Sequence, residues 1–268
     1  MIQFLRESTF AVHDVVKRSW FVLRDHYFSI LGLFFVMFVV FNASGLLASY
    51  FSEDLSLGFR VCIPLLFILL YCGIQLTLFK YLIHVIDHDL DRESIFNTLP
   101  TPTEMLYFFI ALIAIFVSCV LLAGITIAIL TPLVILLIRT FGMPKEMAFN
   151  LGNGFGLLLS LAMLIRMSFY PFFILDKKEK PFRSIRLSFA LTKGNFMKLL
   201  VFLFLYSIWS LLSLYFSYLG FVKIVTVLSF VNSFFVVPFT SVLVAVAYRK
   251  MTLHYKGDDD PGIMENII

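Results

Sequence analysis

The feature that most constrains this chain is a series of long apolar runs that carry almost no charge. About 20 apolar helical residues cross a hydrocarbon layer about 30 Å thick, and six runs reach that length. Their side chains are continuously apolar rather than alternating, which indicates helices and not the strands of a barrel. The predicted spans are residues 29–51, 61–86, 106–138, 155–175, 199–219 and 222–248.

Composition supports a membrane protein. Of the 268 residues, 60% are hydrophobic and only 14% are charged. An ordinary soluble domain has about 25% charged residues, so these few charges could not cover so much apolar surface in water. We therefore expect an all-α polytopic membrane helical bundle over residues 1–256, followed by a mobile tail at 257–268.

The third run is too long for one straight crossing. Gly124 and Pro132 interrupt it, so we expect a kink or a break near them. A break would give seven spans. Basic residues cluster before the first span, between the fourth and fifth spans, and after the sixth. Six spans place all three clusters on one face, which predicts that both termini are cytoplasmic.

Two amphipathic helices are expected beside the spans, at residues 4–27 and 181–196. Each carries an apolar stripe with basic residues off it, as helices in the membrane interface do, although either could be an extension of the next span. The stripes are Val16, Trp20, Leu23 and Tyr27 in the first helix, and Ile185, Phe189, Thr192 and Phe196 in the second.

The two amphipathic segments align at a shift of 169 residues, which places Ser19 on Ser188. An even number of spans separates them, so a parallel internal repeat about an axis normal to the membrane is the natural arrangement. The first two spans would then correspond to the last two. The prolines do not follow the repeat, because Pro64 falls on Ser233.

Residues 170–198 carry a recognisable pattern. A span ends with Pro171 and Asp176, a basic helix follows with Ser188 in its middle, and Thr-Lys-Gly-Asn-Phe stands at the mouth of the next span. This resembles a group of uncharacterised six-span bacterial membrane proteins, which are similar to the membrane domain of some glycerophosphoryl diester phosphodiesterases. The resemblance implies the six-span fold and a location in the bacterial inner membrane. The sequence shows no soluble phosphodiesterase domain, so that activity is not carried over.

Arg166 lies about eleven residues into the predicted fourth span, near mid-membrane at 1.5 Å per residue. A charged side chain at that depth should face the bundle or a watery cavity rather than lipid. Asn232 lies at a similar predicted depth, and Gln75 is a further candidate. We expect an Arg166–Asn232 contact in an intramembrane site for an anion or head group. The alternative is a structural Arg166 bonded to backbone carbonyls at a proline kink.

Two sets of surface residues complete the predicted binding sites. Basic residues after the fourth span are expected to bind anionic lipid head groups at roughly 1 kcal/mol each, or else only to set the topology. They are Lys178, Lys180, Arg183, Arg186 and Lys193. Small residues four apart in the first span favour contact with another helix, of this chain or of a partner. They are Ser44, Gly45, Ala48 and Ser49.

Several motifs are judged not to be sites. His84 and His88 are four residues apart, as are Asp87 and Asp91, but a polar exit from the second span explains them without a metal. The glycines at 152, 154 and 156 follow no strand, so we expect the end of a loop and close helix packing rather than nucleotide binding. We find no catalytic arrangement, and we expect no enzyme activity, no cofactor and no nucleic-acid partner.

The expected function is that of an accessory or scaffold subunit in a larger membrane assembly for secretion, insertion or envelope biogenesis. Its expected partners are membrane lipids, including anionic head groups, and other membrane proteins. The alternative is a transporter or flippase for a lipid or amphiphile, with a cavity near Arg166. A transporter should show a continuous polar cavity reaching Arg166, whereas a packing subunit should not.

Overall fold

The computed structural model describes residues 10–50, 57–87, 98–142 and 144–252. Every regular element in these ranges is a helix, and six helical segments are long and apolar enough to cross a membrane. This confirms the all-α polytopic bundle. The elements are α2 (Val12–Tyr50), α3 (Leu57–Ile86), α4 (Pro102–Phe141), α5 (Lys145–Met167), α6 (Tyr170–Lys177), α7 (Pro181–Lys193), α8 (Phe196–Tyr218), α9 (Val222–Val231), the π-helix η2 (Asn232–Val236) and α10 (Val237–Thr252).

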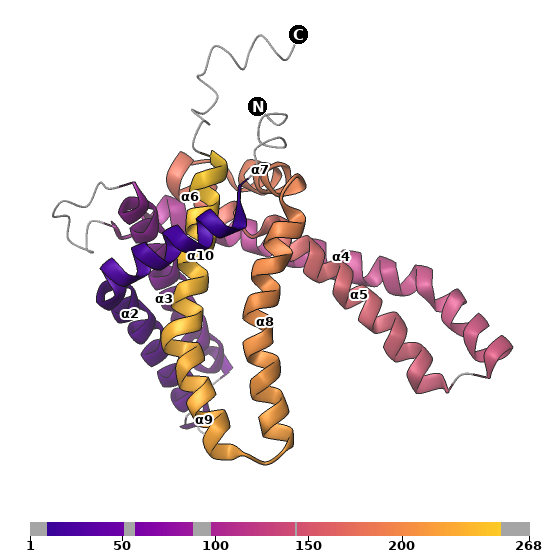
Figure 1. The fold of residues 1–268 in the computed structure, drawn as a ribbon. Coiled ribbons are helices and arrows are strands. Elements are labelled where there is room, and N and C mark those ends of the chain that lie inside the picture. Colours follow the sequence, from indigo (N-terminus) through magenta and orange to yellow (C-terminus); the bar gives the residue numbers. More distant parts are fainter. Residues whose placement is uncertain (1–9, 51–56, 88–97, 143, 253–268) are drawn as a thin grey trace, which may run out of the picture.

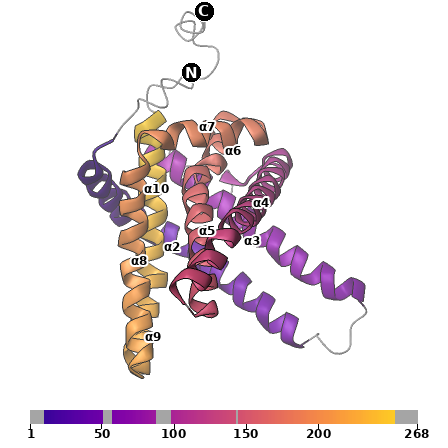
Figure 2. The same cartoon turned by 90° about the vertical axis from the view of Figure 1, so that its right-hand side faces the viewer.

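The long helices form hairpins that diverge from a shared end (Figures 1 and 2). One hairpin is α2 with α3, another is α4 with α5, and a third is α8 with the continuous α9–η2–α10. The short helices α6 and α7 lie at the shared end, where the main core is also found. This core is built by one face of α2, the end of α3, the start of α4, α6, one face of α7, the start of α8 and the end of α10.

The third predicted span is a single helix. The helix α4 has 40 residues and runs through Gly124 and Pro132 without interruption, so the break that would have given seven spans does not occur. At 1.5 Å per residue α4 is about 60 Å long, about twice the hydrocarbon thickness. In Figure 1 the α4–α5 hairpin is strongly inclined relative to α8 and α10. Inclination is the expected way for so long a helix to stay in the membrane.

The fourth predicted span had the wrong limits. The helix α5 starts at Lys145 rather than at residue 155, so the predicted loop at 139–154 is mostly helix, and the glycine run lies inside α5. The expected close packing is correct. A Cβ atom on Gly152 would lie 3.3 Å from Val134 Cγ2, and one on Gly156 would lie 4.0 Å from Thr126 Cγ2. Gly152 therefore lets α5 approach α4 closely at Val134, and Gly156 faces the same helix one turn further on.

The candidate span continues to Lys177, close to the predicted end at residue 175, but its helix is interrupted before Pro171. Proline has no N–H and its ring clashes with the preceding turn, so α5 stops at Met167 and α6 begins at Tyr170. Ser188 of α7 forms hydrogen bonds with the backbone groups left free at this interruption. Its Oγ accepts the N–H of Phe169 (3.1 Å) and donates to the carbonyl of Arg166 (2.8 Å).

Pro238 has a similar effect in the last span. The π-helix η2 immediately precedes it, as is typical where a helix must absorb an irregularity. Pro238 cannot donate to the carbonyl of Phe234. The hydroxyl of Tyr27 donates to that carbonyl instead, at 3.1 Å. A side chain of α2 thus supplies the hydrogen bond that the proline removes, as apolar surroundings demand.

The backbone supports the internal repeat around the two amphipathic segments. His26 interrupts α2 with φ −118° and ψ 21°, and the shift of 169 places it on Asn195, with φ −117° and ψ 7° at the start of α8. The buried positions also coincide under this shift. They pair as Val15 with Ser184, Ser19 with Ser188, Leu23 with Thr192, and Ile30 with Leu199.

The buried faces of these segments differ from the predicted stripes. In α2 the buried side chains are Val15, Ser19 and Leu23, whereas Trp20 is 46% exposed. This face packs on α10, and the corresponding face of α7 packs on α4, α5 and α6. Protein therefore covers both apolar faces. The inner side of each segment is therefore buried by protein, and its position in the membrane interface stays a prediction.

Candidate functional site

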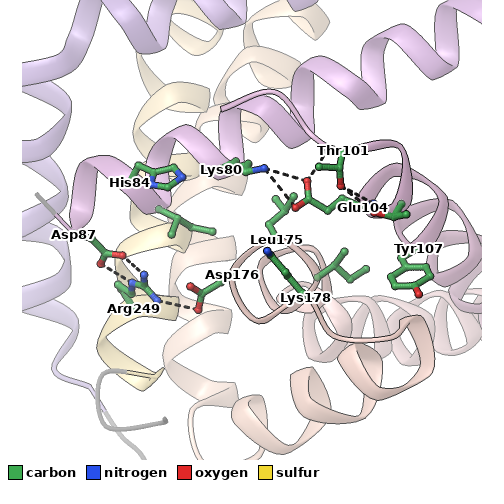
Figure 3. Close-up of a pocket in the computed structure, with 13 residues that line it drawn as sticks. Lys80, His84, Asp87, Thr101, Glu104, Tyr107, Leu175, Asp176, Lys178 and Arg249 are labelled. Carbon is green, nitrogen blue, oxygen red and sulfur yellow. Dashed lines mark hydrogen bonds and ion pairs between the residues drawn. The ribbon is translucent and has the colours of Figure 1, made fainter. Parts of the chain in front are cut away.

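A cavity of about 530 Å³ lies at the shared end of the hairpins, between the end of α3, the start of α4, α6 and the end of α10 (Figure 3). Most of its polar groups are ionisable. The charged side chains that line it are Lys80, Asp87, Glu104, Asp176, Lys178 and Arg249. Three are cations and three are carboxylates, so the cavity has no large net charge.

Lys80 and Glu104 form a nearly buried ion pair on one side of the cavity. The Nζ of Lys80 lies 3.1 Å from Oε2 of Glu104, and the side chains are 18% and 8% exposed. Glu104 also closes a capping box. Its Oε2 accepts the N–H of Thr101 at 2.8 Å, while Thr101 Oγ1 accepts the N–H of Glu104. The pair thus joins the end of α3 to the start of α4.

Arg249 forms the other side of the cavity. Its guanidinium donates to both carboxylate oxygens of Asp87 and, at 2.9 Å, to Oδ2 of Asp176. The hydroxyl of Tyr248 donates to the same oxygen of Asp176 at 3.0 Å. We call Asp87, Asp176 and Arg249 the arginine junction, because it ties together the ends of α3, α6 and α10. Charge-assisted bonds of this kind are the strong ones in proteins.

Three side chains that line the cavity could donate hydrogen bonds to a ligand. Among the described residues, His84, Tyr107 and Lys178 make no side-chain hydrogen bond or ion pair, and Figure 3 shows all three beside the paired residues. Lys178 follows α6 in a left-handed conformation, with φ 53°. The cavity can therefore offer donors to a polar or anionic group. Its paired charges hold helix ends together and do not form a nucleophile with a base.

The His and Asp residues at the end of the second predicted span are only partly described. Asp87 is engaged by Arg249, and His84 faces the cavity, whereas His88 and Asp91 lie outside the described residues. Within residues 10–50, 57–87, 98–142 and 144–252, no group of three His, Cys, Asp or Glu side chains is placed to hold a metal ion.

The predicted Arg166–Asn232 contact is wrong. Arg166 lies in the last turn of α5, and its guanidinium carbon is 5.6 Å from the ring centroid of Phe196, the first residue of α8. Trp209 of α8 bonds to Leu228 of α9, which places Asn232 about nine residues, or about 13 Å, from Phe196 along α8. The predicted contact treated residues 155–175 as one straight helix and matched two positions by residue count, which does not identify the helix that packs beside Arg166.

The other two members of the predicted intramembrane site do not join Arg166 either. Oδ1 of Asn232 is buried in η2 and accepts no hydrogen bond within the described part of the chain. Gln75 is half-buried in α3, and no contact with Arg166 is found there. The alternative for Arg166, a guanidinium bonded to backbone carbonyls at a proline kink, is not seen within the described residues either. It is the carbonyl of Arg166, at the break before Pro171, that accepts hydrogen bonds from Ser188 and Thr192.

The predicted lipid-binding cations share one location. All five are exposed on α7 and its flanking residues, and Arg183 pairs with Glu179 at 3.2 Å. They are Lys178, Lys180, Arg183, Arg186 and Lys193. A cationic face of α7 therefore stands opposite its buried face. The geometry is compatible with anionic head groups.

The small residues of the first span do not pack within the described part of the chain. A Cβ atom on Gly45 would meet nothing within 4 Å, and the hydroxyl of Ser44 bonds to the carbonyl of Phe41 in its own helix. The side chains of Ala48 and Ser49 lie outside the described residues. Any partner helix for this stripe must come from elsewhere.

The arginine junction was not predicted from the sequence. Asp87 was considered only as a metal ligand, Asp176 only beside the start of a basic helix, and Arg249 only as a topology signal. A signal did exist, because all three lie at span ends that the charge pattern places on one face. The sequence alone gives no distance between those ends.

Comparison of the chain with protein-family models, curated proteins and solved structures found no match. The functional argument therefore rests on the geometry of this chain.

Proposed function

We propose that this chain is a non-enzymatic accessory or scaffold subunit of a larger membrane assembly, for secretion, insertion or envelope biogenesis. It would lie in a bacterial inner membrane with both termini cytoplasmic, as the basic clusters indicate. The resemblance to the six-span group is part of the same proposal. The docking element would be the outer part of the α4–α5 hairpin, residues 120–141 and 145–162, which we call the arm.

The arm carries this proposal because the rest of the described chain does not cover it. Side chains that belong to the main core, or pack against it, extend along α4 only as far as Cys119 and begin on α5 only at Met163. Beyond these points the buried residues face the other helix of the hairpin, as Val134 faces Gly152. Figure 1 shows the arm extending away from the other hairpins.

The exposed surface of the arm has the chemistry of a helix-packing face. Gly124 and Ala128 are both exposed and lie one turn apart on α4, and open space surrounds the Cα of Gly124. On α5, Asn150 and Asn153 are exposed and make no side-chain hydrogen bond to other described residues. Small residues and amides drive association of membrane helices, whereas lipid tails would leave the amides unsatisfied.

The alternative, a transporter or flippase, is less well supported. The 530 Å³ cavity does not include Arg166 in its lining. Two smaller grooves beside α8 and α2 are lined mainly by apolar side chains and do not extend the polar cavity into the spans. A polar cavity that reaches Arg166, the feature expected of a transporter, is therefore not formed by these three.

The proposal is tested by photo-crosslinking the full chain in membranes. A photoreactive residue at Ala128 should give a protein adduct of one defined mass, because this position would face the partner helix. The matched control is Phe204, which is 58% exposed on α8. Only lipid adducts at Ala128, or the same protein adduct at both positions, would show that the arm is not a docking surface.

A substitution pair gives an independent test. Gly124→Leu places a branched side chain on the proposed contact face and should abolish the adduct formed from the arm. Gly32→Leu is the matched control, because Gly32 is also exposed in a membrane helix with open space around it. An adduct that survives Gly124→Leu unchanged counts against docking through the arm.

A further inference from the structure

A groove of about 270 Å³ lies between α8 and α10, and the turn between α5 and α6 closes one end of it. In Figure 1 these two helices run side by side below α7. The groove is lined mostly by apolar side chains, among them Ile165, Leu199, Leu203 and Val244. Its few hydroxyl groups include that of Thr240, which bonds to the carbonyl of Val236 in its own helix. The interior is thus suited to hydrocarbon.

Arg166 stands at the mouth of this groove. Its neighbours Ile165 and Ser168 line the groove, and its guanidinium lies over the ring of Phe196 at 5.6 Å. On α8, Phe196 precedes Leu199 by one turn on the same face. The half-buried guanidinium makes no hydrogen bond or ion pair with any described residue. It therefore presents a full set of donors next to an apolar channel.

The groove is long enough for the upper part of an acyl chain. Its lining on α8 extends from Leu199 to Tyr206, which is seven residues or about 10 Å. Half of a hydrocarbon core about 30 Å thick is about 15 Å, so an acyl chain in the groove would extend beyond Tyr206. The charged end of the groove is at the same end of the molecule as the exposed cations of α7. A lipid from the leaflet on that side would place its head group at Arg166.

We propose that this groove binds an anionic phospholipid, with the phosphate at Arg166 and one acyl chain along α8. Guanidinium recognises phosphate through paired hydrogen bonds, and the ring of Phe196 holds the guanidinium plane in place. The exposed Lys193 adds only diffuse attraction, and the other nearby cation, Lys198, is engaged by the carbonyl of Phe10 at 2.6 Å. This site does not depend on docking through the arm.

The test is native mass spectrometry of the purified full chain in detergent. Phosphatidylglycerol and phosphatidylcholine with identical acyl chains are titrated separately, with inorganic phosphate as a third ligand. Wild type should bind phosphatidylglycerol at least about tenfold more tightly than phosphatidylcholine, because both lipids carry the phosphate but the choline cation of phosphatidylcholine would lie beside Arg166 and repel it. Inorganic phosphate should neither bind measurably nor compete, because it lacks the chain that fills the groove.

Two variants separate the site from general attraction of anionic lipid. Arg166→Gln should remove the preference for phosphatidylglycerol, whereas Lys193→Gln removes the same charge from an exposed position nearby and should retain it. Equal loss in both variants would overturn the proposal in favour of diffuse electrostatics. Binding of inorganic phosphate as tight as that of the lipid would overturn it in favour of a free-anion site.

A groove-filling variant keeps the test valid if Arg166→Gln fails to fold. Thr240→Phe adds a ring inside the groove, away from the guanidinium. It should weaken phosphatidylglycerol binding about tenfold while leaving Arg166 in place. Unchanged lipid binding by a monodisperse Thr240→Phe chain would show that the acyl chain does not occupy the groove.

Discussion

Arg249 joins three helix ends, so its replacement measures what holds the hairpins together. Arg249→Met keeps most of the side-chain volume and removes the hydrogen bonds to Asp87 and Asp176. Arg249 is 18% exposed, and its partners are 27% and 10% exposed. Removing one member of a fully buried ion pair costs about 3–5 kcal/mol, and partial exposure lowers this figure. We expect a loss of about 3 kcal/mol in unfolding free energy.

The assay is equilibrium unfolding in mixed micelles with increasing SDS, followed by helical circular dichroism. The matched control is Arg24→Met, which breaks a pair with Asp25 whose side chains are 64% and 58% exposed. Exposed pairs contribute about 0–1 kcal/mol, so this variant should unfold almost like wild type. Adding Asp87→Asn to Arg249→Met should recover part of the loss, because it removes a carboxylate left without its partner.

The reasoning would be refuted if Arg249→Met cost no more than Arg24→Met. It would also fail if Asp87→Asn and Arg249→Met were additive, because residues within one network must show a coupling energy.

Two further variants test local packing with the same assay. Gly152→Leu should destabilise the chain by about 1–3 kcal/mol, since its Cβ meets Val134 at 3.3 Å, whereas Gly154→Leu enters open space and should be nearly neutral. Ser188→Ala should cost about 1–3 kcal/mol, because it leaves the N–H of Phe169 without its acceptor at the break before α6.

A different result would contradict each of these two predictions. Equal effects of Gly152→Leu and Gly154→Leu would show that α4 and α5 do not pack through the glycine face. The control for Ser188→Ala is Ser160→Ala, whose hydroxyl bonds only to the carbonyl of Gly156 within its own helix. A loss no larger than that of Ser160→Ala would mean that Ser188 does not support the break.

The sequence predicted the parts of the fold that depend on local composition. Six apolar runs gave six candidate spans, and the amphipathic segment at 181–196 appears as α7 with Gly194 and Asn195 at its end. The shift of 169, found from the sequence, also pairs the two positions at which the structure breaks the helices, His26 and Asn195. Such features follow from side-chain hydropathy and backbone chemistry within one or two turns, so they can be estimated without tertiary contacts.

Arg166 shows where the prediction of the site stopped. Its depth was estimated by counting residues along an assumed straight span, but the break before Pro171 places it in the last turn of α5, over Phe196. Its expected partner, Asn232, lies in the hairpin of α8 with α9–η2–α10, farther from the shared end of the hairpins than Arg166. Counting residues along one helix estimates the depth of a side chain in the span. It does not identify the helix that packs against that side chain.

By itself, the sequence determined that this chain partitions into hydrocarbon as helices and that its cations gather at the span ends, because transfer free energy acts on each segment separately. Only the tertiary structure decided that Arg249 meets Asp87 and Asp176, that Gly152 faces Val134, and that the arm extends beyond the core. Those outcomes depend on the angles at which the hairpins diverge. The angles are set by side-chain packing between segments that lie far apart in the chain.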